Sequence, residues 1–451
     1  MIVVLCAVLA GVATSRPIGA QVPGDSVKVA RDSSLDSLRA RLARAEAAIL
    51  LLREQLGSES ESAVHTRSRT RFDIAAQVLM NTFATYGRVN NVDVPQTALS
   101  EPPAGATLAS NNALGFTLRQ TRIGAAAAVD DVLGASFSGD FDIDFFGGVQ
   151  NGPGDRRLFP EPRLRTARAR IIWPKTEIMV GAETPLISDL NPVSLASIGT
   201  PEFSGAGNLW NWLGQVRLTQ QLGASTGSAN VRWAIQGAVM TPYSQTVTPG
   251  DPDAVDAGER SGIPAFEGRL RLRWGEDGPV SDVGIGSRGG EVGVGMHKAW
   301  VATSSGGLQE SHAIAIDGHA VIAPGVELRG EAYTGRLLRG LGGGGIAQNY
   351  GVPDPSAPVG TLGPPIVDVA GWAQLNVQPH PVLLTGAGCG IDLTDPDYAP
   401  IRRQNTVCAA YVHWRPVQPL VLGLEYRQIG TRFSTGTFGA RHFNLAFGFE
   451  L

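Results

Sequence analysis

The chain has 451 residues, of which 57 are glycine, and its formal net charge at pH 7 is −4. Hydrophobic residues make up 43% and charged residues 17%, a composition that suits alternating β-strands better than a leucine-rich helical protein. The charge balance does not point to nucleic-acid binding, and beyond the N-terminus no apolar run reaches the roughly 18 residues of a transmembrane helix.

Residues 1–12 form an apolar segment that is followed by small and polar residues. This pattern predicts a secretory signal peptide spanning residues 1–20. Export would place the two later cysteines, Cys389 and Cys408, in an oxidising compartment.

Residues 21–69 are predicted to form a periplasmic coiled coil and a Ser/Glu-rich linker. Apolar residues keep a 3-4 spacing here, at Leu35, Leu38, Leu42, Ala45, Ile49, Leu52 and Leu56. This is the a/d seam of a heptad repeat, and so short a seam gains stability only with partner helices. We expect an oligomerising coiled coil, with an amphipathic helix docked on the same chain as the alternative.

From residue 70 onward the hydrophobic period changes from 3.5 to 2, which is typical of strands with one apolar face. We expect strands near residues 71–85, 114–128, 134–146, 163–173, 176–185, 212–222, 229–240, 265–274, 290–302, 311–322, 326–337, 367–378, 381–391, 405–415, 419–429 and 440–451. About 16 strands predict an all-β, antiparallel transmembrane barrel over residues 70–451. The stretch 275–289 is either a long turn or a further strand.

The last of these segments is the most regular. Phe443, Leu445, Phe447 and Phe449 alternate with polar or small residues up to the end of the sequence. Such a strand is expected to pair with the first and so close the barrel, leaving no edge unpaired in lipid. An amphipathic strand of a soluble sandwich is the alternative for this segment alone.

The connections between the predicted strands alternate in length. Short turns alternate with long loops at residues 87–113, 147–162, 186–211, 241–264, 338–366 and 392–404. Short turns at one end and long loops at the other are typical of outer-membrane barrels. The short turns and the N-terminus should then face the periplasm of a Gram-negative-type bacterium.

Arginines recur on the polar faces of four predicted strands, at Arg168, Arg170, Arg217, Arg232, Arg269, Arg271 and Arg273. A lipid-facing arginine near the middle of the bilayer costs about 2–4 kcal/mol, so these side chains should face the lumen and attract anions. Arg168 and Arg170 either pair with Asp140 or Asp142 on the neighbouring strand or meet solute. Arg269, Arg271 and Arg273 have no obvious acidic neighbour beyond Glu267, so they are the stronger candidates for solute contact.

The third long loop, residues 186–211, carries Asp189 and Glu202. We expect it to fold into the barrel and form a constriction in which these acids face the arginine wall. A contact between this loop and a neighbouring subunit is the alternative.

Cys389 and Cys408 are expected near the loop ends of adjacent strands, where a disulfide is as plausible as two separate thiols. Neither a Cys-x-x-Cys nor a His-Glu-x-x-His motif is present, and the seven histidines are scattered. We therefore expect no catalytic residues, no metal site and no cofactor.

Three motifs together resemble the DcaP-like porins and, more distantly, the phosphate-selective porin O and P family. They are the heptads of residues 35–56, the run RQTRIG at 119–124 followed by FSGDFDIDFF at 137–146, and LRTARARIIWPKTEIMVGAET at 164–184. The resemblance covers most of residues 30–185 and implies a sixteen-stranded homotrimer that passes small anions, dicarboxylates in the first family and phosphate in the second. Two features depart from the pattern: the final residue is Leu451 in place of Phe, and lysine is nearly absent from the predicted lumen, which weakens the phosphate interpretation.

The leading hypothesis is an outer-membrane porin for passive diffusion of small anionic solutes through an arginine-lined lumen, without a cofactor. One alternative is a structural barrel linked to the cell wall by its coiled coil. Another is a surface receptor or adhesin whose long loops plug the lumen.

Overall fold

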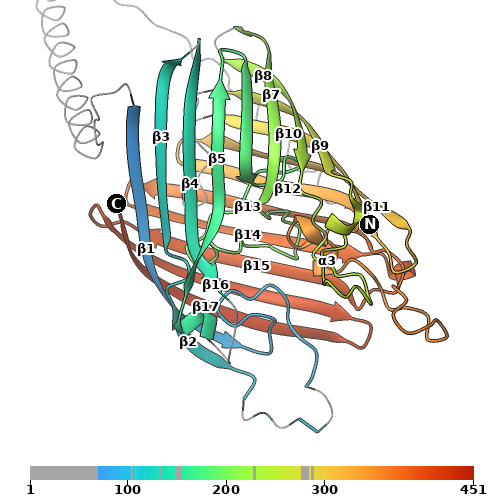
Figure 1. The fold of residues 1–451 in the computed structure, drawn as a ribbon. Helices are drawn as coiled ribbons and strands as arrows, with labels where there is room; N and C mark the ends of the chain where they lie inside the picture. The colour runs from blue at the N-terminus through green and yellow to red at the C-terminus, as the bar shows by residue number, and fades with distance from the viewer. Residues whose placement is uncertain are drawn as a thin grey trace, which may run out of the picture. The chain divides into compact units, whose positions relative to one another are not determined.

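The computed structural model describes residues 70–102, 105–106, 108, 110–132, 134–148, 155–226, 230–275, 284–285 and 289–451. The predicted signal peptide (1–20) and coiled coil with its linker (21–69) lie outside these residues. The described chain forms one antiparallel sheet of seventeen strands (Figure 1). They are β1 (Thr70–Tyr86), β2 (Ala113–Thr117), β3 (Arg122–Val132), β4 (Ala135–Gly147), β5 (Glu161–Ile172), β6 (Thr176–Glu183), β7 (Leu213–Thr226), β8 (Val231–Met240), β9 (Ala265–Trp274), β10 (Gly290–Ala302), β11 (Leu308–Ala323), β12 (Val326–Arg336), β13 (Val367–His380), β14 (Leu383–Thr394), β15 (Arg402–Trp414), β16 (Leu420–Phe433) and β17 (Thr437–Glu450).

The sheet is closed, as the regular last segment predicts. β17 pairs with β1, so that Phe449 lies opposite Val78 and Phe443 opposite Ala84. Every other strand pairs with its neighbours in chain order, apart from the shared pairing of β2 and β3 with β1. The predicted closed antiparallel barrel is confirmed.

The predicted strand 114–128 is divided in two. β2 pairs with residues 81–85 of β1 and β3 with residues 70–77, so the two short strands occupy one position and the barrel has sixteen. The interruption lets Arg119 reach Asp93, with Nη2 and Oδ2 2.5 Å apart. It also turns the Gln120 amide into the lumen, where Nε2 donates to the Ala196 carbonyl at 2.8 Å.

The two faces of the sheet differ in the way that period-2 alternation predicts. On β17 the outward side chains of Phe443, Leu445 and Phe447 are about half exposed, whereas inward-facing Asn444 and Ala446 are almost fully buried. An apolar outward face around a closed sheet is the arrangement of a membrane-spanning barrel.

Long connections gather at one end of the barrel, as predicted, at residues 87–112, 148–160, 184–212, 241–264 and 337–366. The other three connections at this end, 303–307, 395–401 and 434–436, are short, so the long loop predicted at 392–404 is not formed because β14 and β15 extend into it. β9 and β10 pair directly, so no further strand lies between them. Their connection, 275–289, is a long one at the opposite end, an exception to the predicted sorting of loops.

The helices of the described residues are single turns: α2 (Asp155–Leu158), α3 (Gly344–Ala347), η1 (Glu259–Ser261), η2 (Arg339–Leu341) and η3 (Pro396–Tyr398). None of the helices in the described part of the chain is long and apolar enough to cross a membrane.

Candidate functional site

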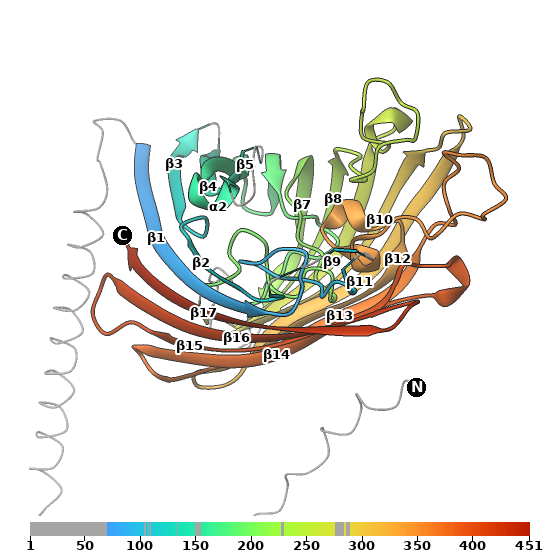
Figure 2. The ribbon, with the colours of Figure 1, turned by 90° about the horizontal axis from the view of Figure 1, so that it is seen from below.

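The connection between β6 and β7, which we call the inner loop (residues 184–212), lies inside the ring of strands (Figure 2). Its apolar side chains are buried, among them Leu186, Ile187, Val193, Leu195, Ile198, Phe203 and Leu209. They pack against inward-facing residues of β9 to β17, such as Trp372 and Val421. The inner loop therefore covers one side of the lumen and leaves the side formed by β3 to β9 open.

Side chains from three strands hold the inner loop in place. Glu267 on β9 accepts the amide of Ile187 at 2.9 Å. Gln374 on β13 accepts the amide of Val193 at 2.7 Å and donates to its carbonyl at 3.0 Å. Glu425 on β16 accepts the amides of Leu195 and Ala196. These bonds satisfy loop backbone groups that would otherwise be buried without partners.

Two inward-facing glycines let the loop backbone approach the wall. A Cβ at Gly295 on β10 would lie 2.2 Å from the Ile187 carbonyl oxygen, and one at Gly390 on β14 would lie 2.1 Å from that of Ala206. Any larger residue at either position would collide with the backbone of the inner loop.

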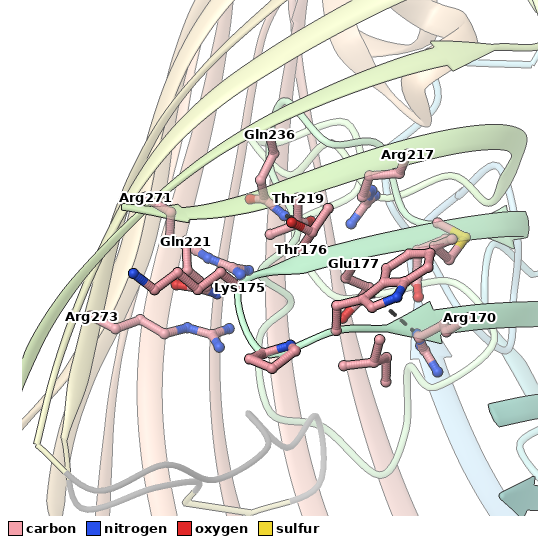
Figure 3. A pocket seen from close by; sticks show the side chains of 15 residues that line it. Arg170, Lys175, Thr176, Glu177, Arg217, Thr219, Gln221, Gln236, Arg271 and Arg273 are labelled. Carbon is pink, nitrogen blue, oxygen red and sulfur yellow. Dashed lines mark hydrogen bonds and ion pairs between the residues drawn. The ribbon is translucent and has the colours of Figure 1, made fainter. Parts of the chain in front are cut away.

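Two adjoining cavities lie along the β3–β9 wall, and Glu183 and Arg217 line both of them. Residues of the inner loop line only one of the two, the loop cavity. The loop cavity, of about 320 Å³, is lined by Arg122, Asp142, Arg165, Thr166, Arg168, Glu183, Thr184, Asp189, Asn191, Trp212 and Arg217. The turn cavity, of about 350 Å³, reaches the short β5–β6 turn; its polar lining is Arg170, Lys175, Thr176, Glu177, Glu183, Arg217, Thr219, Gln221, Gln236, Arg271 and Arg273 (Figure 3).

Positive charge dominates the turn cavity. Five cations, Arg170, Lys175, Arg217, Arg271 and Arg273, face two carboxylates, Glu177 and Glu183, an excess of three. Hydroxyl and amide groups fill the rest of the polar wall. Such a lining attracts small anions and offers them hydrogen-bond donors.

Arg217 has no carboxylate partner within hydrogen-bond or ion-pair distance among the described residues. Its Nε donates to Gln215 Oε1 at 3.1 Å and its Nη2 to the Thr184 carbonyl at 2.8 Å. Neutral partners orient the guanidinium without cancelling its charge. Because Arg217 lines both cavities, it is the best-placed anion contact of the site.

Arg271 and Arg273, two of the residues predicted to contact solute, also line the turn cavity. The nearest acids to Arg271 are distant for an ion pair, with 3.9 Å to Glu291 and 4.0 Å to Asp189. Arg273 is paired with Glu291, but its side chain stays 41% exposed.

Arg269 does not line the open cavities, contrary to the prediction. Its side chain is fully buried, with Nη1 2.5 Å from Asp317 Oδ1 on β11 and Nη2 3.3 Å from Asp189 and 3.5 Å from Glu291. The acids come from the next two strands and from the inner loop, which covers Arg269. Arg232, on the inward face of β8 opposite Arg273, lines neither cavity.

Arg168 and Arg170 both form wall ion pairs and line the cavities. Asp140 lies 2.5 Å from a guanidinium nitrogen of each, and Arg168 also pairs with Glu183. Asp142 joins Arg122 and Arg165 in the same way, at 2.8 and 3.2 Å. Arg168 and Arg170 therefore form the predicted wall ion pairs with Asp140 and also line the cavities.

The two acids of the inner loop occupy different places. Asp189 faces the loop cavity and Arg271; burial alone would raise its pKa, but Arg269 and Arg271 lower that pKa to about 2. Glu202 is buried against the wall, 3.1 Å from Arg427, and lines neither cavity. Burial raises the pKa of Glu202 to about 7 despite the opposing charge of Arg427. Only Asp189 has the location expected of a constriction acid.

Cys389 and Cys408 are joined by a disulfide, with Cα atoms 4.1 Å apart. They are directly opposed on β14 and β15. Both lie in the middle of their strands on the outward face, not near the loop ends as predicted, because the strands extend further than the predicted segments. The disulfide is therefore remote from the lumen.

Several cavity residues were not identified from the sequence: Arg122, Arg165, Lys175, Glu177, Glu183 and Trp212. For Glu177 and Glu183, alternation along β6 is a usable signal, since inward-facing Arg168 and Arg170 predict inward-facing neighbours on the next strand. Arg165 lies at a register shift between β4 and β5, where alternation does not predict its face. Among the described residues, no group of three or more His, Cys, Asp or Glu side chains could hold a metal ion.

Two solved structures share the fold of the described chain. The outer membrane channel DcaP of Acinetobacter baumannii is 14% identical, with 86% of this chain and 100% of that chain covered at a TM-score of 0.60. The anion-selective porin from Comamonas acidovorans is 9% identical, with 85% and 100% covered at a TM-score of 0.50. No protein-family model and no curated protein matches the chain. At these identities the likeness establishes the fold, in agreement with the resemblance stated above.

Proposed function

We propose that the chain is an outer-membrane porin through which small anionic hydrophilic solutes diffuse passively. The observation that carries the proposal is the three-charge cationic excess of the turn cavity, with Arg217 held by neutral groups only. Of the two solved structures with this fold, one is an outer membrane channel and the other an anion-selective porin, which agrees with the proposal.

In this proposal, the charged side chains that line the lumen determine its ion selectivity. An anion entering the loop cavity meets Arg217, which also lines the turn cavity, where Arg271 and Arg170 continue the cationic wall. Asp189 on the inner loop lies 4.0 Å from Arg271, so this acid and the cationic wall set up a local field beside the two cavities. Cations are repelled from the wall, and solute size is limited by the loop. No cofactor or chemical step is needed, since the concentration gradient drives the flux.

The assembly is proposed along with the function. The signal peptide directs export, the barrel spans the outer membrane with its short turns in the periplasm, and the heptads of residues 35–56 join three chains there. The support for this homotrimer is the heptad pattern and the apolar outward face of the sheet.

A barrel plugged by its loops, acting as a surface receptor or adhesin, is the second candidate. It is favoured by the inner loop, which buries the inward faces of β9 to β17. The two adjoining cavities on the opposite side favour the channel.

Planar-bilayer recordings of the full chain under a potassium chloride gradient separate these candidates. We expect discrete conductance steps and a reversal potential displaced toward that of chloride. A reversal potential displaced toward potassium would contradict the anion channel, and the absence of conductance from correctly folded protein would favour the plugged barrel.

A further inference from the structure

A third cavity lies at the loop end of the barrel and shares no lining residue with the loop and turn cavities. We call it the outer cavity; its volume is about 300 Å³. It is formed by the long connection after β1, the inner loop, the connections after β8 and β12, and the first residue of β15. We propose that the outer cavity binds a small organic carboxylate with an apolar body.

The charges of the outer cavity are unbalanced. Arg339 and Arg402 line it, and no Asp or Glu is among its lining residues. Within the described chain, the Arg339 guanidinium forms no hydrogen bond and no ion pair, and its Nε is buried without a partner. Arg402 donates only to backbone carbonyls, from Nε to Ile346 at 2.9 Å and from Nη2 to Ala347 at 3.2 Å. Two guanidinium groups without a carboxylate favour an anionic ligand, and a carboxylate fits the planar fork of arginine.

A neutral donor adds to this arrangement. The indole Nε1 of Trp210, which lines the cavity, is buried and has no acceptor among the described residues. Buried donors are nearly always hydrogen-bonded, so an unpaired one beside an unpaired guanidinium points to an acceptor supplied from outside the chain.

The remaining wall suits an organic body better than an inorganic ion. The Trp210 ring, Leu99 and Ile346 give it an apolar face. A fully hydrated inorganic anion would gain nothing from these side chains, whereas an aromatic or branched carboxylate would bury its body against them.

Three residues that line the cavity have a left-handed backbone conformation. Gln245, Ile346 and Ala347 line the cavity with left-handed φ values of 56°, 54° and 58°. This conformation is a rarity for a β-branched residue such as Ile346. Here it points the carbonyls of Ile346 and Ala347 at Arg402, which fixes the guanidinium in the wall. Strained residues of this kind cluster at binding sites.

The outer cavity is separated from the diffusion path by a pair of indole rings. Trp210 packs edge-on against Trp212, with ring centroids 5.1 Å apart, and Trp212 lines the loop cavity. The outer cavity is thus a distinct site beside the passage. Its ligand binding does not require that the channel conducts, so the inference extends beyond the proposed function.

The test is isothermal titration of benzoate into the full folded chain in detergent. Wild type should bind benzoate saturably. Arg339→Gln should weaken binding about tenfold or more, because a charge-assisted hydrogen bond is lost. Trp210→Phe, which keeps an aromatic ring but removes the N–H, should weaken it less. Arg260→Gln, a change in an exposed loop arginine outside the cavity, is the matched control and should leave binding unchanged.

Equal affinity of wild type and Arg339→Gln, or no saturable binding by wild type, would overturn the proposal. Inorganic phosphate that binds as tightly as benzoate would overturn the assignment of an organic ligand. Because Arg339 lies outside the turn and loop cavities, the Arg339→Gln channel should keep the ion selectivity of wild type. Failure of this site is therefore distinguishable from failure of the proposed porin function.

Discussion

Replacing Gly295 and Gly390 together by valine is expected to dislodge the inner loop and widen the channel. Each new side chain would start about 2 Å from a loop carbonyl oxygen, and backbone atoms cannot yield unless the loop moves. Conductance should rise roughly twofold or more as the water-filled cross-section grows, and ion selectivity should fall. Single-channel recording of protein that passes a heat-modifiability test for the folded barrel measures both.

Gly237→Val is the matched control for this change. Gly237 also lies in a strand, β8, but a Cβ there would meet nothing within 4 Å. The Gly237→Val channel should have the same conductance as wild type. A folded double variant with wild-type conductance would show that the inner loop does not set the size of the passage.

Arg269→Met is expected to destabilise the barrel strongly. It removes the cation that faces Asp317, Glu291 and Asp189. Breaking a buried pair by removing one partner costs about 3–5 kcal/mol, since the remaining charge is left buried without compensation. The urea midpoint for unfolding from lipid vesicles, and the yield of folded protein, should both fall.

Arg273→Gln is the comparison, four residues away on the same strand and the same face. Its side chain is 41% exposed and pairs with Glu291, so solvent compensates for the loss and the midpoint should change little. Equal destabilisation by the two changes would contradict the assignment of Arg269 to structure and Arg273 to the channel.

Much of the fold follows from local pattern. Period-2 alternation places side chains on one of two faces whatever the partner strand, so Phe443 and Arg271 could be assigned outward and inward from the sequence. The division of the second predicted strand at residues 118–121 could not be assigned in this way. It depends on Asp93 in a distant loop and on the inner loop, whose positions no local period encodes.

For the site, the sequence predicted only the face of the sheet on which each residue lies. Arg217, Arg269 and Arg271 look alike in the sequence, because each alternates with apolar residues. Their roles differ because Glu291 and Asp317 lie one and two strands away from Arg269, and because the inner loop covers Arg269 but not Arg217. Such contacts depend on register and on loop placement, which composition and spacing do not determine.

The central claim is that the cationic wall of the turn cavity selects anions. The most direct test is the reversal potential under a potassium chloride gradient for the triple variant Arg170→Gln/Arg217→Gln/Arg271→Gln. The control triple, Arg71→Gln/Arg260→Gln/Arg441→Gln, removes the same charge from exposed positions outside the cavities. We predict that the cavity variant loses anion selectivity while the control keeps it. Undiminished anion selectivity in a folded cavity variant would contradict the account.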